Sequence, residues 1–308
     1  MYIVTHRKAF FILTAILFVG AILSISVFGL PRSIDFTGGS LTEINYTSVR
    51  PDLVDLKENL EKLEIGTISL RETGENGVVL RSAVLTPEKY EEVLTVLSSE
   101  GTREIVELRF NSIGPSLGTE LAIKALYALG AVIVAIMLFI AFAFRRVSGP
   151  VSGWTYGLIV VAILIHDVIV PAGFYALLAH FTGSQVDSLF VVALLAILGY
   201  SVNDTIVIFD RVREHLHNNE HAKVEEAFEV TVGKSITETL GRSINTSVTV
   251  VLALLALVFL GSKETVDFAL MLIAGVVAGT YSSILVAAPL LVTLAKRFGR
   301  EAVITKKI

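Results

Sequence analysis

The stretch FFILTAILFVGAILSISVFGL, at residues 10–30, carries no charge and is long enough to cross a membrane as a helix. A helix needs roughly 20 apolar residues to cross a hydrocarbon core of ~30 Å. Four of six such uncharged runs qualify directly, and the third and fourth along the chain qualify if a few polar residues are allowed within them. The sequence therefore predicts six membrane-spanning helices. The other five runs cover residues 125–144, 147–165, 188–203, 243–262 and 268–295.

The composition supports a membrane protein. Hydrophobic residues make up 53% of the 308 residues and charged residues only 18%, a balance that is unusual for a soluble domain of this length. The absence of cysteine excludes disulfides and thiolate metal sites. The first run is too long for the core of a signal peptide, and Gly29-Leu30-Pro31 follows it instead of a small-residue cleavage site, so we expect a retained anchor.

The distribution of lysine and arginine predicts the orientation, because cytoplasmic loops of membrane proteins are enriched in both. Fourteen of them flank one set of helix ends, whereas the short loops on the opposite side hold only Lys263. We therefore expect a multi-pass protein of the inner (cytoplasmic) membrane of the cell, with both termini cytoplasmic and residues 31–120 extracytoplasmic. The fourteen are Arg7, Lys8, Arg145, Arg146, Arg211, Arg213, Lys223, Lys234, Arg242, Lys296, Arg297, Arg300, Lys306 and Lys307.

The segment between the first two spans has alternating strand and helix patterns. Leucines share one helical face in Pro51–Leu63, and Thr86–Ser99 opens with a capping residue and a proline. Their order with the strands is βαββαβ, the split βαβ arrangement of ferredoxin-like domains. From Arg32 to Arg109 there are 15 acidic and nine basic residues, which argues against a surface for nucleic acid or anionic lipid. The strands are expected at residues 41–46, 67–73, 77–84 and 103–110.

The fold class that we predict is membrane all-α, with six transmembrane helices and an α+β ferredoxin-like extracytoplasmic domain between helices 1 and 2. Residues 1–30 form the cytoplasmic N-terminus and helix 1, residues 31–120 the domain, and residues 121–308 the five-helix region with a cytoplasmic C-terminus. A cytoplasmic loop at 211–241 is either a solvated connector or carries a short amphipathic helix on the membrane face. The five helices are expected at about residues 121–145, 151–180, 187–210, 242–262 and 266–295.

Several predicted spans contain polar residues, and ionisable groups inside hydrocarbon cost several kcal/mol, so each needs a reason. Asp204 lies seven residues before Arg211, ~10 Å inside the cytoplasmic end. Arg242 opens the next span and can adjust its depth, so we expect these two side chains to meet. Asp167 lies deeper, 13 residues beyond Trp154, and is expected to contact His166 or a partner subunit.

A carboxylate beside an arginine within the membrane is typical of a proton relay, because protonation releases the pair and lets the helices rearrange. The alternative is a static polar contact between helices. The surrounding Tyr200, Asn203 and Thr205 favour the relay for Asp204, whereas both interpretations stay open for Asp167. Sodium also remains open as the coupling ion, because carboxylate, amide and hydroxyl oxygens can bind it. We expect no metal site at His166, since no second histidine lies at helical spacing, and no cofactor.

Five motifs in order resemble the SecF family, the smaller half of the SecDF accessory complex of the protein-export machinery. The resemblance covers nearly the whole chain. It places the chain with the resistance–nodulation–division transporters, whose twelve spans form two similar halves. The motifs are IDFTGG at residues 34–39, His166-Asp167, ILGYSVNDTIVIFDRVRE at residues 197–214, RSINTS at residues 242–247 and GTYSS at residues 279–283.

The resemblance implies a non-enzymatic subunit of the Sec translocase. Such a subunit uses the proton motive force to promote preprotein translocation across the cytoplasmic membrane and its completion on the outer side. The implied partners are SecD, the SecYEG translocon, YajC, unfolded preprotein and the lipid bilayer, with no nucleic acid.

The family's motifs also imply roles for individual residues. Asp204 and Arg242 match the family's proton-pathway positions, and Asp167 matches a position whose role is less settled. Asp35, Gly38 and Gly39 match a structural signature, in which two glycines permit a tight bend. The supporting polar residues are His166, Asn203, Tyr200, Thr205, Thr246 and Ser247.

Two other functions remain as alternatives. A stand-alone proton-coupled exporter of small molecules or lipids would have to be a homo-oligomer, because the second six-span half is missing. An intramembrane aspartyl protease would also place aspartates on two helices, but its usual G-x-G-D is absent and Ser201-Val202-Asn203-Asp204 stands instead. Co-purification of a SecD chain would exclude the first alternative, and an assay for protease activity in detergent would test the second.

Overall fold

The computed structural model describes residues 2–145, 150–261 and 263–297. Four of the predicted cytoplasmic cations, Arg146, Arg300, Lys306 and Lys307, lie outside the described residues, and so does the side chain of Lys263. The chain divides into two compact units, Arg32–Leu126 and the remainder, Met1–Pro31 with Tyr127–Ile308. We refer to these as the sheet unit and the helical unit.

The helical unit contains the membrane helices. Within the described residues, six helices are long and apolar enough to cross a membrane, in agreement with the number predicted. A short α1 (Tyr2–Thr5) precedes the first of them. The six are α2 (Arg7–Phe28), α6 (Pro115–Ala143), α7 (Gly153–Thr182), α8 (Ser188–Ala222), α9 (Phe228–Leu260) and Thr265–Arg297, which comprises most of α10 (Lys263–Ser282), a π-helical turn (Ser283–Ala287) and α11 (Ala288–Arg297).

Capping residues set the ends of α7 and the start of α8. The Ser152 hydroxyl accepts the Thr155 amide at the start of α7, and the Asp187 carboxylate accepts the Phe190 amide at the start of α8. These contacts satisfy amides that have no partner within the helix. Gly183 ends α7 in the left-handed conformation, with φ 71°.

The prediction of a loop at residues 211–241 is wrong. Helix α8 continues to Ala222 and α9 begins at Phe228, so only residues 223–227 connect them. The two helix ends pair with each other as a hairpin, and the predicted amphipathic helix on the membrane face is absent from these residues. The prediction ended the fourth span at about residue 210, where charged residues become frequent, but Arg, Glu and Lys are good helix formers in water. We refer to residues 211–240 as the hairpin extension.

Two other predicted bounds need correction. Helix α6 begins at Pro115, inside the range 31–120 that was predicted to be the folded domain, because proline fits the first turn of a helix. The last span is not a single regular helix at 266–295, because a π-helical turn interrupts it. Neither feature changes the hydropathy of the segment, so composition did not reveal it.

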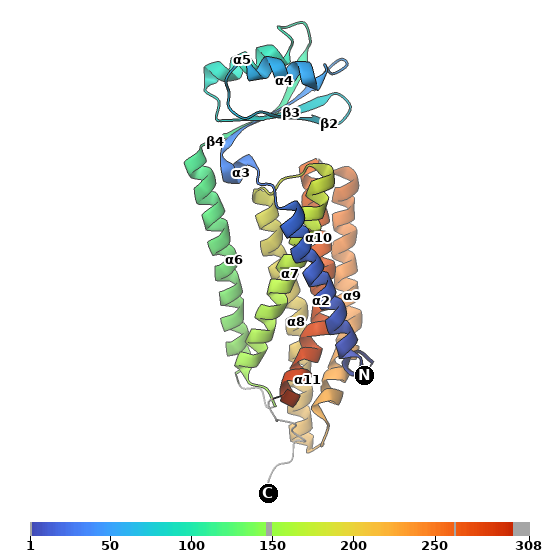
Figure 1. The fold of residues 1–308 in the computed structure, drawn as a ribbon. Coiled ribbons are helices and arrows are strands. Elements are labelled where there is room, and N and C mark those ends of the chain that lie inside the picture. The colour runs from blue at the N-terminus through green and yellow to red at the C-terminus, as the bar shows by residue number, and fades with distance from the viewer. Residues whose placement is uncertain (1, 146–149, 262, 298–308) are drawn as a thin grey trace. The chain divides into compact units, whose positions relative to one another are not determined.

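The sheet unit contains a four-stranded antiparallel sheet with the strand order β2-β3-β1-β4 within the described residues. Helices α4 and α5 cover the same face of this sheet (Figure 1). The buried side chains between helices and sheet include Ile44, Tyr46 and Leu80. In chain order the elements are α3 (Ile34–Thr37), β1 (Gly39–Tyr46), α4 (Leu53–Glu61), β2 (Ser69–Thr73), β3 (Gly77–Ser82), α5 (Pro87–Leu97) and β4 (Ile105–Ile113).

Helices α7 and α8 and the last span, Thr265–Arg297, are the most buried of the six, whereas α2 has only Thr14 and Ala21 buried. Near one end, the Tyr156 ring stacks on Phe144 at 4.9 Å between ring centroids and meets the edge of Phe209 at 5.0 Å. The two buried aspartates, Asp167 and Asp204, therefore lie on two of the three most buried spans.

Candidate functional site

A buried polar cluster surrounds Asp167 on α7. The Asp167 side chain is fully buried, and its Oδ1 lies 2.7 Å from Nδ1 of His166. Its Oδ2 accepts the hydroxyl of Ser201 from α8, and also that of Ser282 from α10 at 2.9 Å. Three helices thus supply hydrogen bonds to one carboxylate, and both of its oxygens have partners.

The hydrogen-bond partners fix the protons of His166. A carboxylate only accepts, so Nδ1 of His166 donates to Asp167 when Asp167 is charged. Nε2 of the neutral ring then accepts the hydroxyl of Tyr281, 2.9 Å away on α10. Asp167 therefore has hydrogen-bond partners within this chain, and His166 is one of them, as expected.

Asp204 has a different environment. Its carboxylate is buried on α8, with 4% of the residue exposed, yet Oδ2 has no hydrogen-bond partner among the described residues. The hydroxyl of Ser243 on α9 lies beside it and is also buried without a partner. Thr280 on α10 also lies beside this carboxylate. Two orphaned polar atoms in one buried location can hold a proton or a water molecule without displacing other contacts.

The expected ion pair between Asp204 and Arg242 is absent from the described part of the chain. Arg242 interacts electrostatically with Asp204, but its side chain is exposed on α9, and no salt bridge joins the two. The expectation of direct pairing rested on depth alone. Depth does not specify the rotation of α9, which directs Ser243 and Ser247 inward and Arg242 outward.

Hydroxyl groups connect the two aspartate environments to α9 and α10. The Tyr200 hydroxyl donates to Ser247 at 3.0 Å, and Ser247 lies 2.6 Å from the Thr280 hydroxyl. Thr205, buried beside Asp204 on α8, lies 2.7 Å from the hydroxyl of Ser283. The other two predicted supporting residues, Asn203 and Thr246, are exposed.

Small residues on α10 allow this hydroxyl network to form. An added Cβ at Gly275 would lie 2.2 Å from the Ile197 side chain, and one at Gly279 would lie 2.9 Å from Cβ of Ser201. The close approach of α10 to α8 brings Ser282 and Ser283 into contact with α7 and α8. The π-helical turn begins at Ser283, and such turns occur frequently at functional sites.

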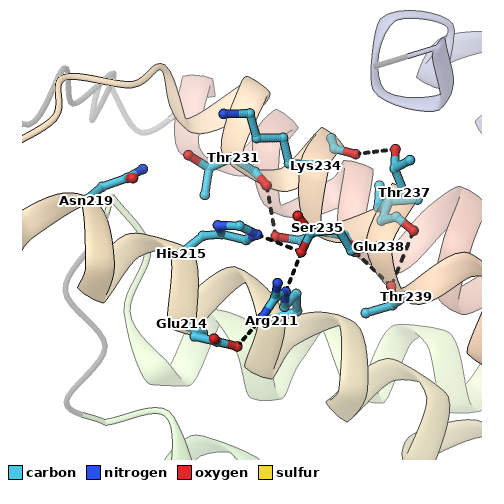
Figure 2. A network of polar contacts seen from close by, with 12 residues as sticks. Arg211, Glu214, His215, Asn219, Thr231, Lys234, Ser235, Thr237, Glu238 and Thr239 are labelled. Atoms are coloured by element: carbon cyan, nitrogen blue, oxygen red, sulfur yellow. Dashed lines mark hydrogen bonds and ion pairs between the residues drawn. The ribbon is translucent and has the colours of Figure 1, made fainter. Parts of the chain in front are cut away.

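The hairpin extension carries a separate polar network, shown in Figure 2. Glu238 on α9 accepts from Arg211 and lies 2.9 Å from Nε2 of His215, both on α8. Partial burial raises the pKa of Glu226, but hydrogen bonds from Lys234, Thr231 and Asn219 outweigh it and hold that pKa below its usual value. These groups fasten the ends of α8 and α9 to each other.

The glycine signature lies in the sheet unit and has a structural geometry. Gly38 and Gly39 have φ angles of 74° and 128°, which disfavour other residues. An added Cβ would lie 2.6 Å from Cα of Pro115 at Gly38, and 2.7 Å from the Ser82 carbonyl oxygen at Gly39. The bend and the close backbone contacts explain both glycines, and Asp35 lies in the preceding turn, α3.

The sequence prediction included five further site residues only within its motifs and gave them no role in the site: Ser201, Ser243, Thr280, Tyr281 and Ser282. A helical-face analysis gives a partial signal, because Ser243 is one turn before Ser247 and Ser201 is one turn before Thr205. Their partners on other helices follow only from the rotation of each helix, which the polar pattern alone does not determine.

The matches to known proteins agree with this arrangement. The family described as "Protein export membrane protein SecD/SecF, C-terminal" matches residues 93–297, which is more than half of the chain and includes Asp167, Asp204 and Arg242. The chain belongs to the SecD/SecF family. Within this family, the protein translocase subunit SecF of Thermobaculum terrenum is 37% identical over 305 residues, covering 94% of this chain and 93% of that protein. SecF of Anaerolinea thermophila is 36% identical over 292 residues, with 94% and 92% covered.

Solved SecDF structures match as well. The crystal structure of SecDF from Thermus thermophilus, described as a translocon-associated membrane protein, has a TM-score of 0.80 at 30% identity. The match covers 96% of this chain but only 39% of that one. SecDF in a super-membrane-facing form matches with a TM-score of 0.62 over 97% of this chain and 39% of that chain. The present SecD/SecF family member therefore spans about two fifths of the solved SecDF chains.

Proposed function

We propose that this protein is a SecF subunit that joins a SecD chain to promote preprotein translocation by the Sec translocase, driven by the proton motive force. The observation that carries the proposal is the similarity to curated SecF subunits, which are 37% and 36% identical over 94% of this chain. Under this proposal the protein is not an enzyme and needs no cofactor.

The exposed polar side chains of the bundle support a partner subunit. Asn203 on α8 and both Arg242 and Thr246 on α9 are exposed, although they lie on helices that are apolar enough to span a membrane. An arginine facing lipid is costly, whereas one facing an acidic group of a partner helix is not. SecD is the partner that we propose for this surface, with SecYEG and YajC as further members of the assembly.

The sheet unit is proposed to be an extracytoplasmic domain that contacts unfolded preprotein. Its βαββαβ element order and antiparallel strand order of β2-β3-β1-β4 support a ferredoxin-like fold. The cations that flank the other ends of the spans support cytoplasmic termini and an extracytoplasmic residue range of 31–120. Within this proposal, domain boundaries follow the predicted ranges, with α6 starting earlier, at Pro115.

Asp204 is proposed to be the principal proton-binding group. Its buried carboxylate has an unpaired oxygen, so a proton can be added without breaking a hydrogen bond at that atom. Arg242 is proposed to act across the partner interface. Asp167, which has hydrogen-bond partners at both carboxylate oxygens, is proposed to be a second group on the same proton pathway.

Preprotein translocation into inverted membrane vesicles tests the function. We expect a proton gradient to stimulate translocation when this chain and its SecD are present, and a sodium gradient of equal size to give no stimulation. Stimulation by sodium alone would exclude protons as the coupling ion, and stimulation by neither would reject the proposed function.

The cysteine-free sequence allows a matched test for the partner. A single cysteine at Thr246, which is exposed beside Arg242, should crosslink to a SecD-type chain in native membranes. A cysteine at Ser243, which is buried, is the control and should not crosslink. Exclusive crosslinking to a second copy of this chain would favour the stand-alone exporter.

A further inference from the structure

Helix α2 contacts α7 along one narrow seam. The Phe18 ring stacks on His166, with 6.0 Å between ring centroids and 19° between ring planes. Farther along, the Ser24 hydroxyl donates to the Gly173 carbonyl at 2.8 Å, and the Phe28 ring lies 4.6 Å from that of His180. The rest of α2 is largely exposed apart from its contact with the π-helical turn, so the seam with α7 is the main contact that holds α2 on the bundle.

The seam is tight at its centre. An added Cβ at Gly173 would lie 2.5 Å from Cα of Ala21, so the two backbones touch. Because packed helices at such distance move in discrete steps and not by smooth deformation, a small displacement at one end of the seam moves the whole helix. The direct chain connection then runs from α2 through residues 29–33 into the sheet unit.

His166 is the residue at which this seam meets the buried cluster. One ring edge donates to Asp167, the other accepts from Tyr281, and the ring face lies against Phe18. The titratable groups that contact His166 are thus Asp167 on its own helix and Tyr281 on α10. From α2 it meets the Phe18 ring, and from α8 Ser201 reaches it only through Asp167.

One added proton changes these contacts in a defined way. If the proton binds Nε2 of His166, the ring becomes an imidazolium, Nε2 donates to the Tyr281 oxygen, and the Tyr281 hydroxyl must turn away. If the Nδ1 proton then moves to Asp167, the carboxyl becomes neutral and the His166 ring returns to neutral, now with its proton on Nε2. In either state the hydrogen bond between His166 and Tyr281 is reversed, and the charge that faces Phe18 changes with the imidazolium.

We propose that Phe18 and His166 are positioning residues through which the protonation state of the Asp167 cluster sets the position of α2, and thereby acts on the sheet unit to which α2 leads. This inference rests on the proposed function, because it describes how a proton taken up in the bundle reaches the extracytoplasmic part. The signal passes from Asp167 to His166, then to Phe18, and then along the seam past Gly173.

Spin labels on α2 and α8 test the proposal in the full-length chain in lipid nanodiscs. Cysteines replace Val27 and Val192, both exposed, in a chain that has no other cysteine. Asp167→Asn mimics the protonated carboxyl, and we expect it to shift the label distance by about 1–2 Å or more, as for other helix shifts. His166→Gln, which breaks the link to Asp167, should shift it too and serves if Asp167→Asn does not fold.

Phe18→Ala decides the route. In a Phe18→Ala background, Asp167→Asn should no longer shift the label distance. Phe28→Ala removes the other phenylalanine–histidine contact of the seam, and Leu17→Ala truncates the exposed neighbour, so both controls should retain the shift. The proposal is overturned if the shift survives Phe18→Ala, if either control abolishes it equally, or if neither cluster variant moves the labels.

The label measurement does not depend on transport, so it separates this inference from the proposed function. If no gradient stimulates translocation in the vesicles, the proposed function is rejected. The label distances then still decide whether the Asp167 cluster controls the position of α2. If the wild type is stimulated, Phe18→Ala should lose most of the stimulation and Leu17→Ala should retain it. Full stimulation with Phe18→Ala would contradict the inference alone.

Discussion

Asp167 and Asp204 are both buried among the spanning helices, but only Asp167 has hydrogen-bond partners at both of its carboxylate oxygens. Oδ1 of Asp167 meets His166 and Oδ2 meets two serine hydroxyls, whereas Oδ2 of Asp204 has no partner within the described residues. A buried polar atom without a hydrogen-bond partner is costly, so the two aspartates differ in how well the fold satisfies their carboxylate oxygens.

Asp204→Asn should abolish gradient-stimulated translocation, because an amide cannot take up the proton. The variant should cost little stability, since Arg242 is exposed and forms no ion pair that the substitution would break. Arg242→Gln should likewise leave the melting temperature of the isolated chain unchanged but reduce stimulation. Thermal unfolding in detergent and the vesicle assay measure the two effects separately.

Asp210→Asn is the matched control for Asp204→Asn. It removes a carboxylate from the same helix, at an exposed position paired with Arg213, and should preserve translocation. Wild-type translocation by Asp204→Asn would assign Asp204 a purely structural role. A large loss of stability in Asp204→Asn would instead indicate that Arg242 and Asp204 interact strongly in the folded protein.

The sequence identified the spans and the polar residues in them because both depend on composition and spacing. Uncharged runs predicted the six helices, and the cost of burying charge marked His166, Asp167 and Asp204. The contacts could not be predicted in the same way. The serine pair on Asp167 depends on the rotation of α8 and α10, and the exposure of Arg242 depends on that of α9.

The hairpin extension is a second feature that depends on contacts between helices and could not be predicted from composition. Its charged residues resemble a solvated loop in a hydropathy profile, but Arg211 and His215 pair with Glu238 across two helices. Pairing between two helices is a property of their packing. A hydropathy profile, which is calculated over one sequence window at a time, therefore places the end of α8 too early and the start of α9 too late.

The sheet unit is expected to fold without the spanning helices. Its buried core of Ile44, Tyr46, Leu60, Leu80 and Leu97 is supplied by the strands and the two helices of the unit itself. A fragment of residues 32–114 should therefore give a mixed α/β circular dichroism spectrum and dispersed amide proton resonances. As a control, Leu80→Ala should destabilise the fragment by about 2–5 kcal/mol. A disordered spectrum from the unmodified fragment would refute independent folding.

The stability of that fragment should fall at alkaline pH. Burial raises the pKa of Tyr46 to about 12 from 10.0, and its hydroxyl donates to the Leu97 carbonyl at 2.8 Å. A pKa raised on folding gives a stabilising contribution that is present below pH 10.0 and is lost as the pH rises through about 12. Urea unfolding between pH 9 and about 12 measures the loss. Tyr46→Phe should be less stable near neutral pH but should flatten this pH dependence, and an unchanged dependence would assign it to another group.

Gly173→Ala should separate α2 from α7. The new Cβ would meet Cα of Ala21 at 2.5 Å and its carbonyl oxygen at 2.7 Å, so α2 must move away and the hydrogen bond from Ser24 to residue 173 must lengthen. Overpacking of this kind costs about 1–3 kcal/mol, which thermal unfolding in detergent would register as a lower melting temperature. Gly20→Ala on α2 is the control, because its Cβ meets nothing within 4 Å. Adding Ala21→Gly to Gly173→Ala should restore little, since backbone atoms of residue 21 remain in the way. Full recovery of the melting temperature in that double variant would mean that only the two methyl groups collide and that the backbones of α2 and α7 are not in contact.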